Sequence, residues 1–128
     1  MNYFIFLAAI ISLGAVIVHF TLGWKIYLKP VLDSGIDLVP KKGMQSVFHY
    51  VSVFLVLATL VLFAGSHRSC PLYDYVHHMV RFIAVVYAFF AIVQLIIALT
   101  SGLPGGMLKL FQWMFWGAIA VLAIIGCL

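Results

Sequence analysis

Four long stretches without a charged side chain constrain this chain more than any other feature of its sequence. Asp, Glu, Lys and Arg are absent from residues 1–24, 43–67, 82–108 and 110–128. A helix needs about 20 mostly apolar residues, at about 1.5 Å each, to cross the ~30 Å hydrocarbon layer of a bilayer. Each stretch can therefore hold one membrane crossing.

The amino-acid composition excludes several classes of protein. Of the 128 residues, 66% are hydrophobic and 8% are charged, against about 45–50% and about 25% in ordinary soluble domains. So few polar side chains cannot cover a water-soluble exterior, which excludes a soluble enzyme and a disordered tail. The Lys and Arg residues lie beside apolar stretches, where membrane proteins place them, so the positive net charge does not indicate a nucleic-acid binder.

The fold class follows from the cost of unpaired backbone groups in lipid, which is several kcal/mol for each group. A helix avoids this cost because its backbone groups form hydrogen bonds within the same segment. We predict an all-α polytopic membrane protein: one domain, 1–128, forming an antiparallel up-down bundle of four transmembrane helices. The predicted spans are residues 3–29, 41–66, 71–100 and 104–127. Pro30 and Pro40 bracket the predicted first loop, and the Gly-rich segment 101–106 forms the predicted third turn.

The distribution of positive charge predicts the orientation in the membrane. Only Arg68 and Arg81 lie near the second loop, whereas the lysines flank the first and third loops. These lysines are Lys25, Lys29, Lys41, Lys42 and Lys109. Since cytoplasmic loops carry the excess of Lys and Arg, we expect loops one and three inside and both termini outside.

Small and polar side chains recur at helical spacing within the spans, where membrane helices approach closely and form hydrogen bonds. In the first span they are Ala8, Ser12, Ala15, His19 and Gly23. In the second span they are Gln45, His49, Ser52, Val56 and Thr59. We expect these stripes to face the interior of the bundle.

One group of these side chains is predicted to meet in the cytoplasmic third of the bundle. His19 lies six residues before Lys25 and His49 seven residues after Lys42, so both imidazoles lie ~9–10 Å inside the same boundary, and we expect them to face each other. The candidate ligand-binding residues are His19, His49, Gln94, Gln112 and Trp116.

Several interpretations of this group are open. Ionisable side chains inside a membrane are costly and suggest a functional site, here one for a proton, an ion or a small polar molecule. A b-type haem between His19 and His49, or a metal ion, are further alternatives. Alternatively, the neutral imidazoles only join helices through hydrogen bonds. The sequence contains no recognised catalytic motif, so an enzymatic activity is left open but not favoured.

A second polar group lies on the predicted outer side. Its side chains are of types that bind zinc or copper: His67, Cys70, Asp74 and His77. Their spacing matches no known zinc-finger pattern. The alternative is that polar side chains in this region pair with one another at the membrane interface. Cys70 and Cys127 fall on the same side. They are therefore candidates for a disulfide if that compartment is oxidising, or else are two unpaired thiols.

Short elements of the sequence resemble a family of small four-span bacterial inner-membrane proteins of uncharacterised function. These elements are His19-x-x-x-Gly23, Pro30-x-Leu32, Phe48-His49 and Gln112-Trp113. Many relatives have Trp before the second histidine, where this chain has Phe48. The resemblance implies a bacterial inner membrane, hence periplasmic termini, and brings no known activity, substrate or cofactor.

The function that we predict from the sequence is that of a non-enzymatic inner-membrane protein. A polar, His-lined pocket within the bilayer would bind or pass a proton, an ion or a small polar molecule. The alternatives are a b-type haem redox subunit and a structural accessory subunit of a larger membrane complex. We expect membrane lipid around the spans. Because a bundle of 128 residues has little room for its own conduction path, we also expect the protein to form a homo-oligomer or to belong to a larger complex.

Overall fold

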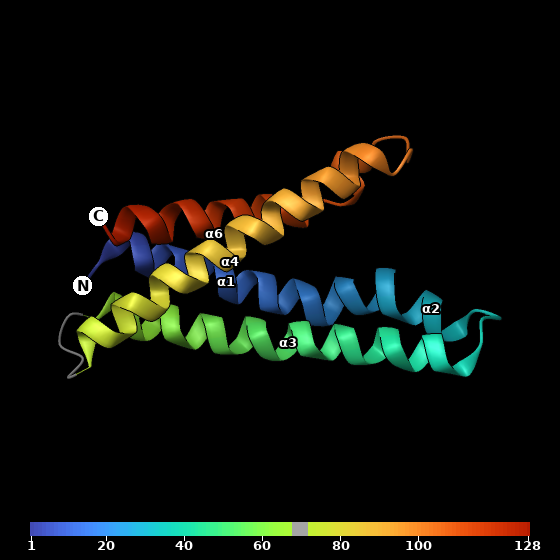
Figure 1. The fold of residues 1–128 in the computed structure, drawn as a ribbon, viewed down its shortest axis with the longest axis horizontal. Helices are drawn as coiled ribbons and strands as arrows, with labels where there is room; N and C mark the ends of the chain where they lie inside the picture. The colour runs from blue at the N-terminus through green and yellow to red at the C-terminus, as the bar shows by residue number, and fades with distance from the viewer. Residues whose placement is uncertain (68–71) are drawn as a thin grey trace.

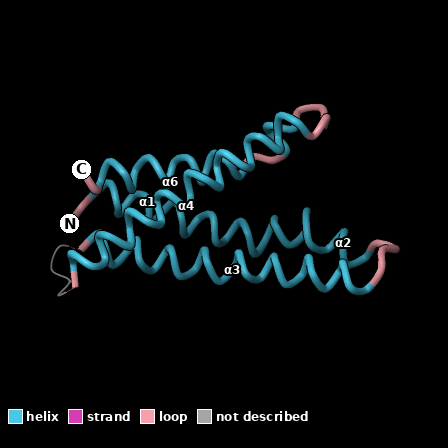
Figure 2. Tube along the Cα trace, in the orientation of Figure 1, coloured by secondary structure: helices cyan, strands magenta, loops and turns pink. Residues whose placement is uncertain are grey.

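The fold was analysed in a computed structural model, which describes residues 1–67 and 72–128. Every element in these two ranges is a helix (Figures 1 and 2). In chain order they are α1 (Tyr3–Val18), the π-helix η1 (His19–Leu28), α2 (Lys29–Asp33), α3 (Leu38–Ser66), α4 (Tyr73–Thr100), α5 (Gly106–Lys109) and α6 (Gln112–Gly126). The predicted all-helical class is confirmed.

Three helices are long and apolar enough to cross a membrane. They are Tyr3–Asp33, Leu38–Ser66 and Tyr73–Thr100, with 31, 29 and 28 residues. Their apolar side chains cover the outside of the molecule; Leu60 is 60% and Phe82 62% exposed. Since such a surface is stable in lipid rather than in water, these helices fit a membrane protein.

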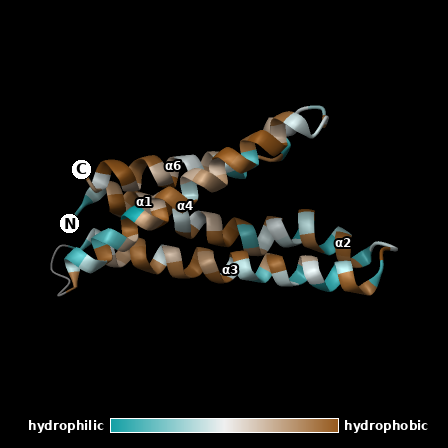
Figure 3. Ribbon diagram, viewed as in Figure 1, coloured by the Kyte–Doolittle hydropathy of each residue, from teal (hydrophilic) through white to brown (hydrophobic). Residues whose placement is uncertain are grey.

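The helices form two arms that separate toward one end. The chain termini lie together at the other end, where α1 packs against α3 and α6, and α6 packs along α4 (Figure 1). Toward the far end, α4 and the start of α6 diverge from η1 and α3 (Figure 1). The C-terminal half of α3 is mostly hydrophobic, whereas its N-terminal half, at the diverging end, carries more hydrophilic residues (Figure 3).

The first predicted loop is shorter in the structure than the sequence suggested. The helical segment continues past residue 29 to Asp33, and α3 begins at Leu38 rather than at residue 41. Pro30 lies in the first turn of α2, and Pro40 lies in the first turn of α3. Because the first N–H groups of a helix have no partner in that helix, proline is tolerated there and did not mark the ends of the loop.

The fourth predicted helix, 104–127, is interrupted in the structure. Gly105 has a left-handed backbone, with φ of 70°, and the single turn of α5 ends at Lys109 before α6 begins at Gln112. A Cβ on Gly106 would lie 2.7 Å from the carbonyl oxygen of Ala98. The close approach of this turn to the end of α4 explains why the chain bends before α6.

The core occupies the end of the bundle that holds the termini. Its fully buried side chains come from α1, α3, α4 and α6; the larger aliphatic ones are Ile5, Leu55, Leu62, Val80 and Ile119. A buried hydroxyl group also joins α1, α3 and α4, since Ser12 Oγ lies 2.7 Å from Thr59 Oγ1 and 3.0 Å from the Tyr87 hydroxyl. Hydrogen bonds and close packing together hold this end closed.

Candidate functional site

The two arms border an open cleft of about 520 Å³ at the diverging end of the bundle. Side chains from η1, α3, α4 and α6 contribute to its walls. The lining residues are His19, Tyr27, Phe48, Val51, Phe89, Phe90, Val93, Gln94, Gln112 and Trp116. Four of the five predicted ligand-binding residues, His19, Gln94, Gln112 and Trp116, therefore line one cavity.

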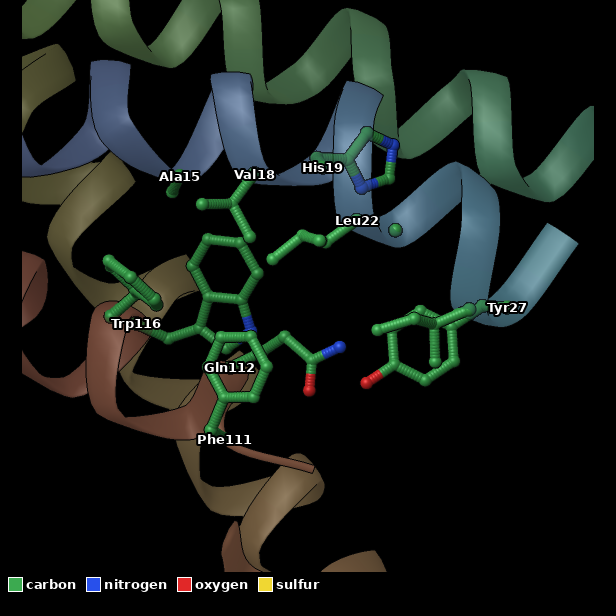
Figure 4. Close-up of a pocket in the computed structure, with 11 residues that line it drawn as sticks. Ala15, Val18, His19, Leu22, Tyr27, Phe111, Gln112 and Trp116 are labelled. Atoms are coloured by element: carbon green, nitrogen blue, oxygen red, sulfur yellow. The ribbon is translucent and has the colours of Figure 1, made fainter. Parts of the chain in front are cut away.

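A narrow space of about 40 Å³ continues from the cleft between η1 and the start of α6. His19, Tyr27, Gln112 and Trp116 line it as well. Figure 4 shows the Gln112 amide between the Trp116 side of the space and the Tyr27 ring, with His19 across from it on η1. The polar groups of the site thus converge from the two arms.

The His19 ring is held by α3. Its Nε2 atom lies 2.9 Å from Ser52 Oγ and 3.3 Å from the Phe48 carbonyl oxygen. The ring also stacks on Phe48, with centroids 4.1 Å apart and an angle of 17° between the planes. Two polar contacts and one stacking contact fix the imidazole at the boundary between α3 and the cleft.

The backbone around His19 is unusual. The chain changes from α-helix to the π-helix η1 at this residue and stays so to Leu28. π-helical turns are rare and occur often at functional sites. At Gly23, one turn later, a Cβ would lie 3.7 Å from both His19 Nδ1 and Phe48 Cε2, so the glycine leaves one edge of the imidazole with little cover.

The α6 wall of the cleft contains a polar atom that lacks a partner. Gln112 Oε1 is buried and accepts no hydrogen bond from the described residues. Next to it, Trp116 stacks on Tyr87, with centroids 5.6 Å apart, and Tyr87 is fully buried. A buried amide oxygen without a partner costs free energy, so a molecule that satisfies the Gln112 amide would stabilise this arrangement.

His49 does not join the other predicted residues. Its side chain is exposed and lines a separate groove of about 330 Å³ with Phe20, Ser52, Val53, Val56 and Leu57. Phe48 stacks on His19 but contacts the edge of His49. The two imidazoles therefore line different cavities and do not face each other across one, as the sequence suggested.

His49 lies outside the cleft because α3 packs against α1 through a different face from the one that the sequence suggested. The helix turns a different stripe toward α1 from the one expected: Phe48, Ser52, Leu55, Thr59 and Leu62. Ser52 and Thr59 belong to both stripes, but Val56, expected inside, is exposed. Both stripes have steps of four, three, four and three residues, so helical spacing by itself did not distinguish the two faces.

The lining residues overlooked in the sequence are mainly aromatic. Phe48 had been noted only as the residue before His49, whereas Tyr27, Phe89 and Phe90 had no assigned role; all four line the cleft. Tyr27 also donates a hydrogen bond from its hydroxyl to the Lys109 carbonyl oxygen, at 3.3 Å, and so joins the two arms. In a sequence with 11 Phe and 6 Tyr, aromatic residues alone could not mark a site.

The proposed outer metal site gains no support from the described residues. Among them there is no group of three or more His, Cys, Asp or Glu side chains that could hold a metal ion. His67 Nδ1 lies 3.0 Å from Ser66 Oγ, and His77 contacts the Tyr73 ring. Asp74 is exposed, and Cys70 lies outside the described residues.

The predicted disulfide also concerns Cys70 and so falls outside the residues that the structure describes. Its proposed partner, Cys127, is buried at the end of α6. The carbonyl oxygen of Cys127 accepts a hydrogen bond of 3.1 Å from Arg81 Nη2. The Arg81 guanidinium on α4 thus binds the backbone at the end of α6.

The chemistry available in the cleft is that of an uncharged binding site. Its described lining residues include no Asp, Glu, Lys or Arg, and His19 and Tyr27 are its ionisable groups. Comparisons of the chain with models of protein families, with curated proteins and with solved structures found no match. Function must therefore be inferred from the geometry of the cleft.

Proposed function

We propose that this protein is a non-enzymatic, four-span protein of the bacterial inner membrane whose cleft binds a small uncharged molecule. The observation that carries the proposal is the cavity of about 520 Å³ into which His19, Gln94 and Gln112 bring polar groups among aromatic walls. Ligand sites in proteins have this size, about 300–1,000 Å³, and this mixture of apolar walls with few polar groups.

Binding is favoured over conduction by the contrast between the cleft and the rest of the bundle. Beyond the stacked pair of Tyr87 and Trp116 the interior is filled by fully buried side chains, including Ile5, Leu62 and Val80. The buried hydroxyls near Ser12 are used in hydrogen bonds to one another. A cavity that ends against such packing suits a molecule that enters and leaves from one side.

The membrane arrangement is part of the proposal. The helix α6 has 15 residues and rises about 22 Å, so a fourth crossing would include the turn that precedes it. The lysines place both termini in the periplasm by the positive-inside rule. Alkaline phosphatase should be active when fused after residue 128 and inactive when fused within residues 34–37; the reverse pattern would contradict this orientation.

We also propose that the protein works as a homo-oligomer or within a larger membrane complex. The groove around Phe20 and His49, of about 330 Å³, and another of about 380 Å³ that includes Ala91 and Gly117 lie on its apolar outer surface. Small residues allow membrane helices to approach closely. The mass of the protein in nanodiscs of native lipid should exceed that of one chain; a strictly monomeric particle would contradict this part.

Filling the cleft tests its role in binding. Val93 lines the cleft and Val85 does not, although both are valines of α4 and are 54% and 49% exposed. Val93→Trp should remove the saturable fluorescence increase of N-phenylnaphthylamine, an uncharged aromatic probe, in nanodiscs that hold the full chain. Val85→Trp should retain it. Equal saturable binding in both variants, or none in the unmodified protein, would reject the proposed site.

A further inference from the structure

The hydrogen bonds around His19 define which ring nitrogen carries the proton. The Ser52 hydroxyl donates to the Phe48 carbonyl oxygen at 2.9 Å. The Phe48 carbonyl oxygen can only accept, so its 3.3 Å contact with His19 Nε2 is a hydrogen bond when Nε2 carries the hydrogen, and Ser52 Oγ, 2.9 Å away, then accepts from the same N–H. A neutral imidazole has one N–H and one lone pair. We therefore assign the hydrogen to Nε2.

The lone pair of His19 is consequently on Nδ1. This atom has no hydrogen-bond partner among the described residues, since both recorded contacts of the ring involve Nε2. A Cβ on Gly23 would lie 3.7 Å from this atom, so the glycine leaves that side of Nδ1 without a side chain. The ring stands at the boundary between α3 and the cleft (Figure 4). His19 lines both the cleft and the narrow space that it shares with Gly23, so a molecule in the cleft that reaches Nδ1 meets an acceptor that has no donor among the described residues.

The remaining walls limit the shape of a molecule that could supply this donor. Phe48, Phe89, Phe90 and Trp116 line the cleft, and aromatic faces favour flat rings through stacking. The amides of Gln94 and Gln112 can each donate and accept. The lining carries no formal charge, and burying an unpaired ionised group there would be costly.

We propose that the cleft selects lipid-soluble aromatic rings that carry hydroxyl donors, with hydroquinones as the ligand class, and that His19 Nδ1 accepts the hydrogen bond that distinguishes them. Ser52 is the positioning residue, because its bond to Nε2 keeps the acceptor on the cleft side of the ring. The inference rests on the proposed binding function of the same cleft. It concerns recognition alone and involves no electron transfer.

Matched probes test this inference on the unmodified full-length protein. Decylhydroquinone, decylbenzoquinone and the dimethyl ether of the hydroquinone share one ring and tail, but only the first can donate a hydrogen bond. Anaerobic titration calorimetry in nanodiscs should give about tenfold tighter binding of the hydroquinone, the effect of one hydrogen bond of roughly 1.4 kcal/mol. Equal affinity for all three probes, or a preference for the quinone, would overturn the inference.

Variants assign the preference to His19. His19→Phe should bind the three probes equally, whereas His49→Phe, a matched change outside the cleft, should keep the tenfold preference. Ser52→Ala removes the contact that holds the proton on Nε2, and should reduce the preference for the hydroquinone from about tenfold to about threefold, which is about half of the free-energy difference between the probes. Ser46→Ala, on the same helix, should leave the preference at about tenfold. A preference that persists in His19→Phe would overturn the role of this residue.

The failure of the inference and the failure of the proposed function give different results. If N-phenylnaphthylamine binds saturably and Val93→Trp abolishes that binding, but the hydroquinone has no advantage, the cleft binds ligands of another class and the inference alone fails. If no probe binds saturably, both the proposed function and the inference are wrong, because the inference requires a cleft that binds ligands.

Discussion

The two ends of the bundle differ in how many hydrogen bonds join their helices. At the end that holds the termini, Asn2 donates from its backbone to the Ser66 carbonyl oxygen at 2.7 Å and from its side chain to that of Gly126 at 2.6 Å. Arg81 donates to the Cys127 carbonyl oxygen. These contacts join α1, α3, α4 and α6, although His77 Nδ1 at this end is also buried without a partner among the described residues.

At the diverging end the polar groups are less fully used. One hydrogen bond, from Tyr27 to the Lys109 carbonyl oxygen, joins η1 to the turn before α6. Gln112 Oε1 has no partner in the described residues, and His19 uses only Nε2. Several interhelical hydrogen bonds stabilise one end of this small bundle, whereas the few contacts between the arms at the other end leave room for the ligand site that we propose there.

Overpacking the closed end should have the largest effect on stability. A Cβ on Gly126 would lie 2.5 Å from Ile5 Cγ1 and 3.1 Å from the Ile5 backbone nitrogen, so Gly126→Ala should lower the free energy of unfolding by about 1–3 kcal/mol. Gly14→Ala is the control, because nothing lies within 4 Å of that Cβ. Unfolding in SDS of the protein in mixed micelles measures both. An equal response of the two variants would contradict the tight packing of this end.

Removing the central hydroxyl should have the next largest effect. Ser12→Ala leaves the buried Thr59 and Tyr87 hydroxyls without their shared partner, and should cost about 1–1.5 kcal/mol, near the upper range for hydrogen bonds between membrane helices. Ser46→Ala should cost almost nothing, since Ser46 is exposed and binds the Lys42 carbonyl of its own helix. The same unfolding assay distinguishes them; an unaffected Ser12→Ala would show that this hydroxyl cluster does not stabilise the bundle.

A change in the open end should act in the opposite direction. Gln112→Leu removes a buried oxygen that lacks a partner, and should raise the free energy of unfolding by about 0.5–1 kcal/mol while weakening binding of N-phenylnaphthylamine. Gln45→Leu, at a site where the amide binds Lys42, should change neither quantity. A loss of stability in Gln112→Leu would indicate that the amide is paired, and that the two ends differ less than proposed.

The smallest effect is expected at the contact between the arms. Tyr27→Phe removes the hydrogen bond to the Lys109 carbonyl oxygen and should lower the free energy of unfolding by no more than about 0.6 kcal/mol. Hydrogen exchange should become faster at residues 106–111 but stay unchanged at residues 55–62, which lie in the closed half. Uniformly faster exchange would mean that the two ends open together.

The stripe on the first helix was predictable from spacing alone. Ala8, Ser12, Ala15 and Gly23 are all buried, because small and polar residues allow close packing that leucine-rich faces do not. On α3 the same reasoning chose the face of His49, whereas the structure buries that of Leu55 and Leu62. When lipid surrounds the bundle, apolar side chains are stable on either side of a helix, so hydropathy does not select between neighbouring faces.

The sequence by itself determined that the chain is helical and where its long apolar segments lie, because a bilayer requires internally bonded backbone over a fixed thickness. It also identified His19, Gln94, Gln112 and Trp116 as residues that lie at a similar depth in the bundle. Only the tertiary structure decided that His49 faces away and that the arms separate around a cleft. Those features depend on how side chains from distant segments pack, which no local pattern of residues encodes.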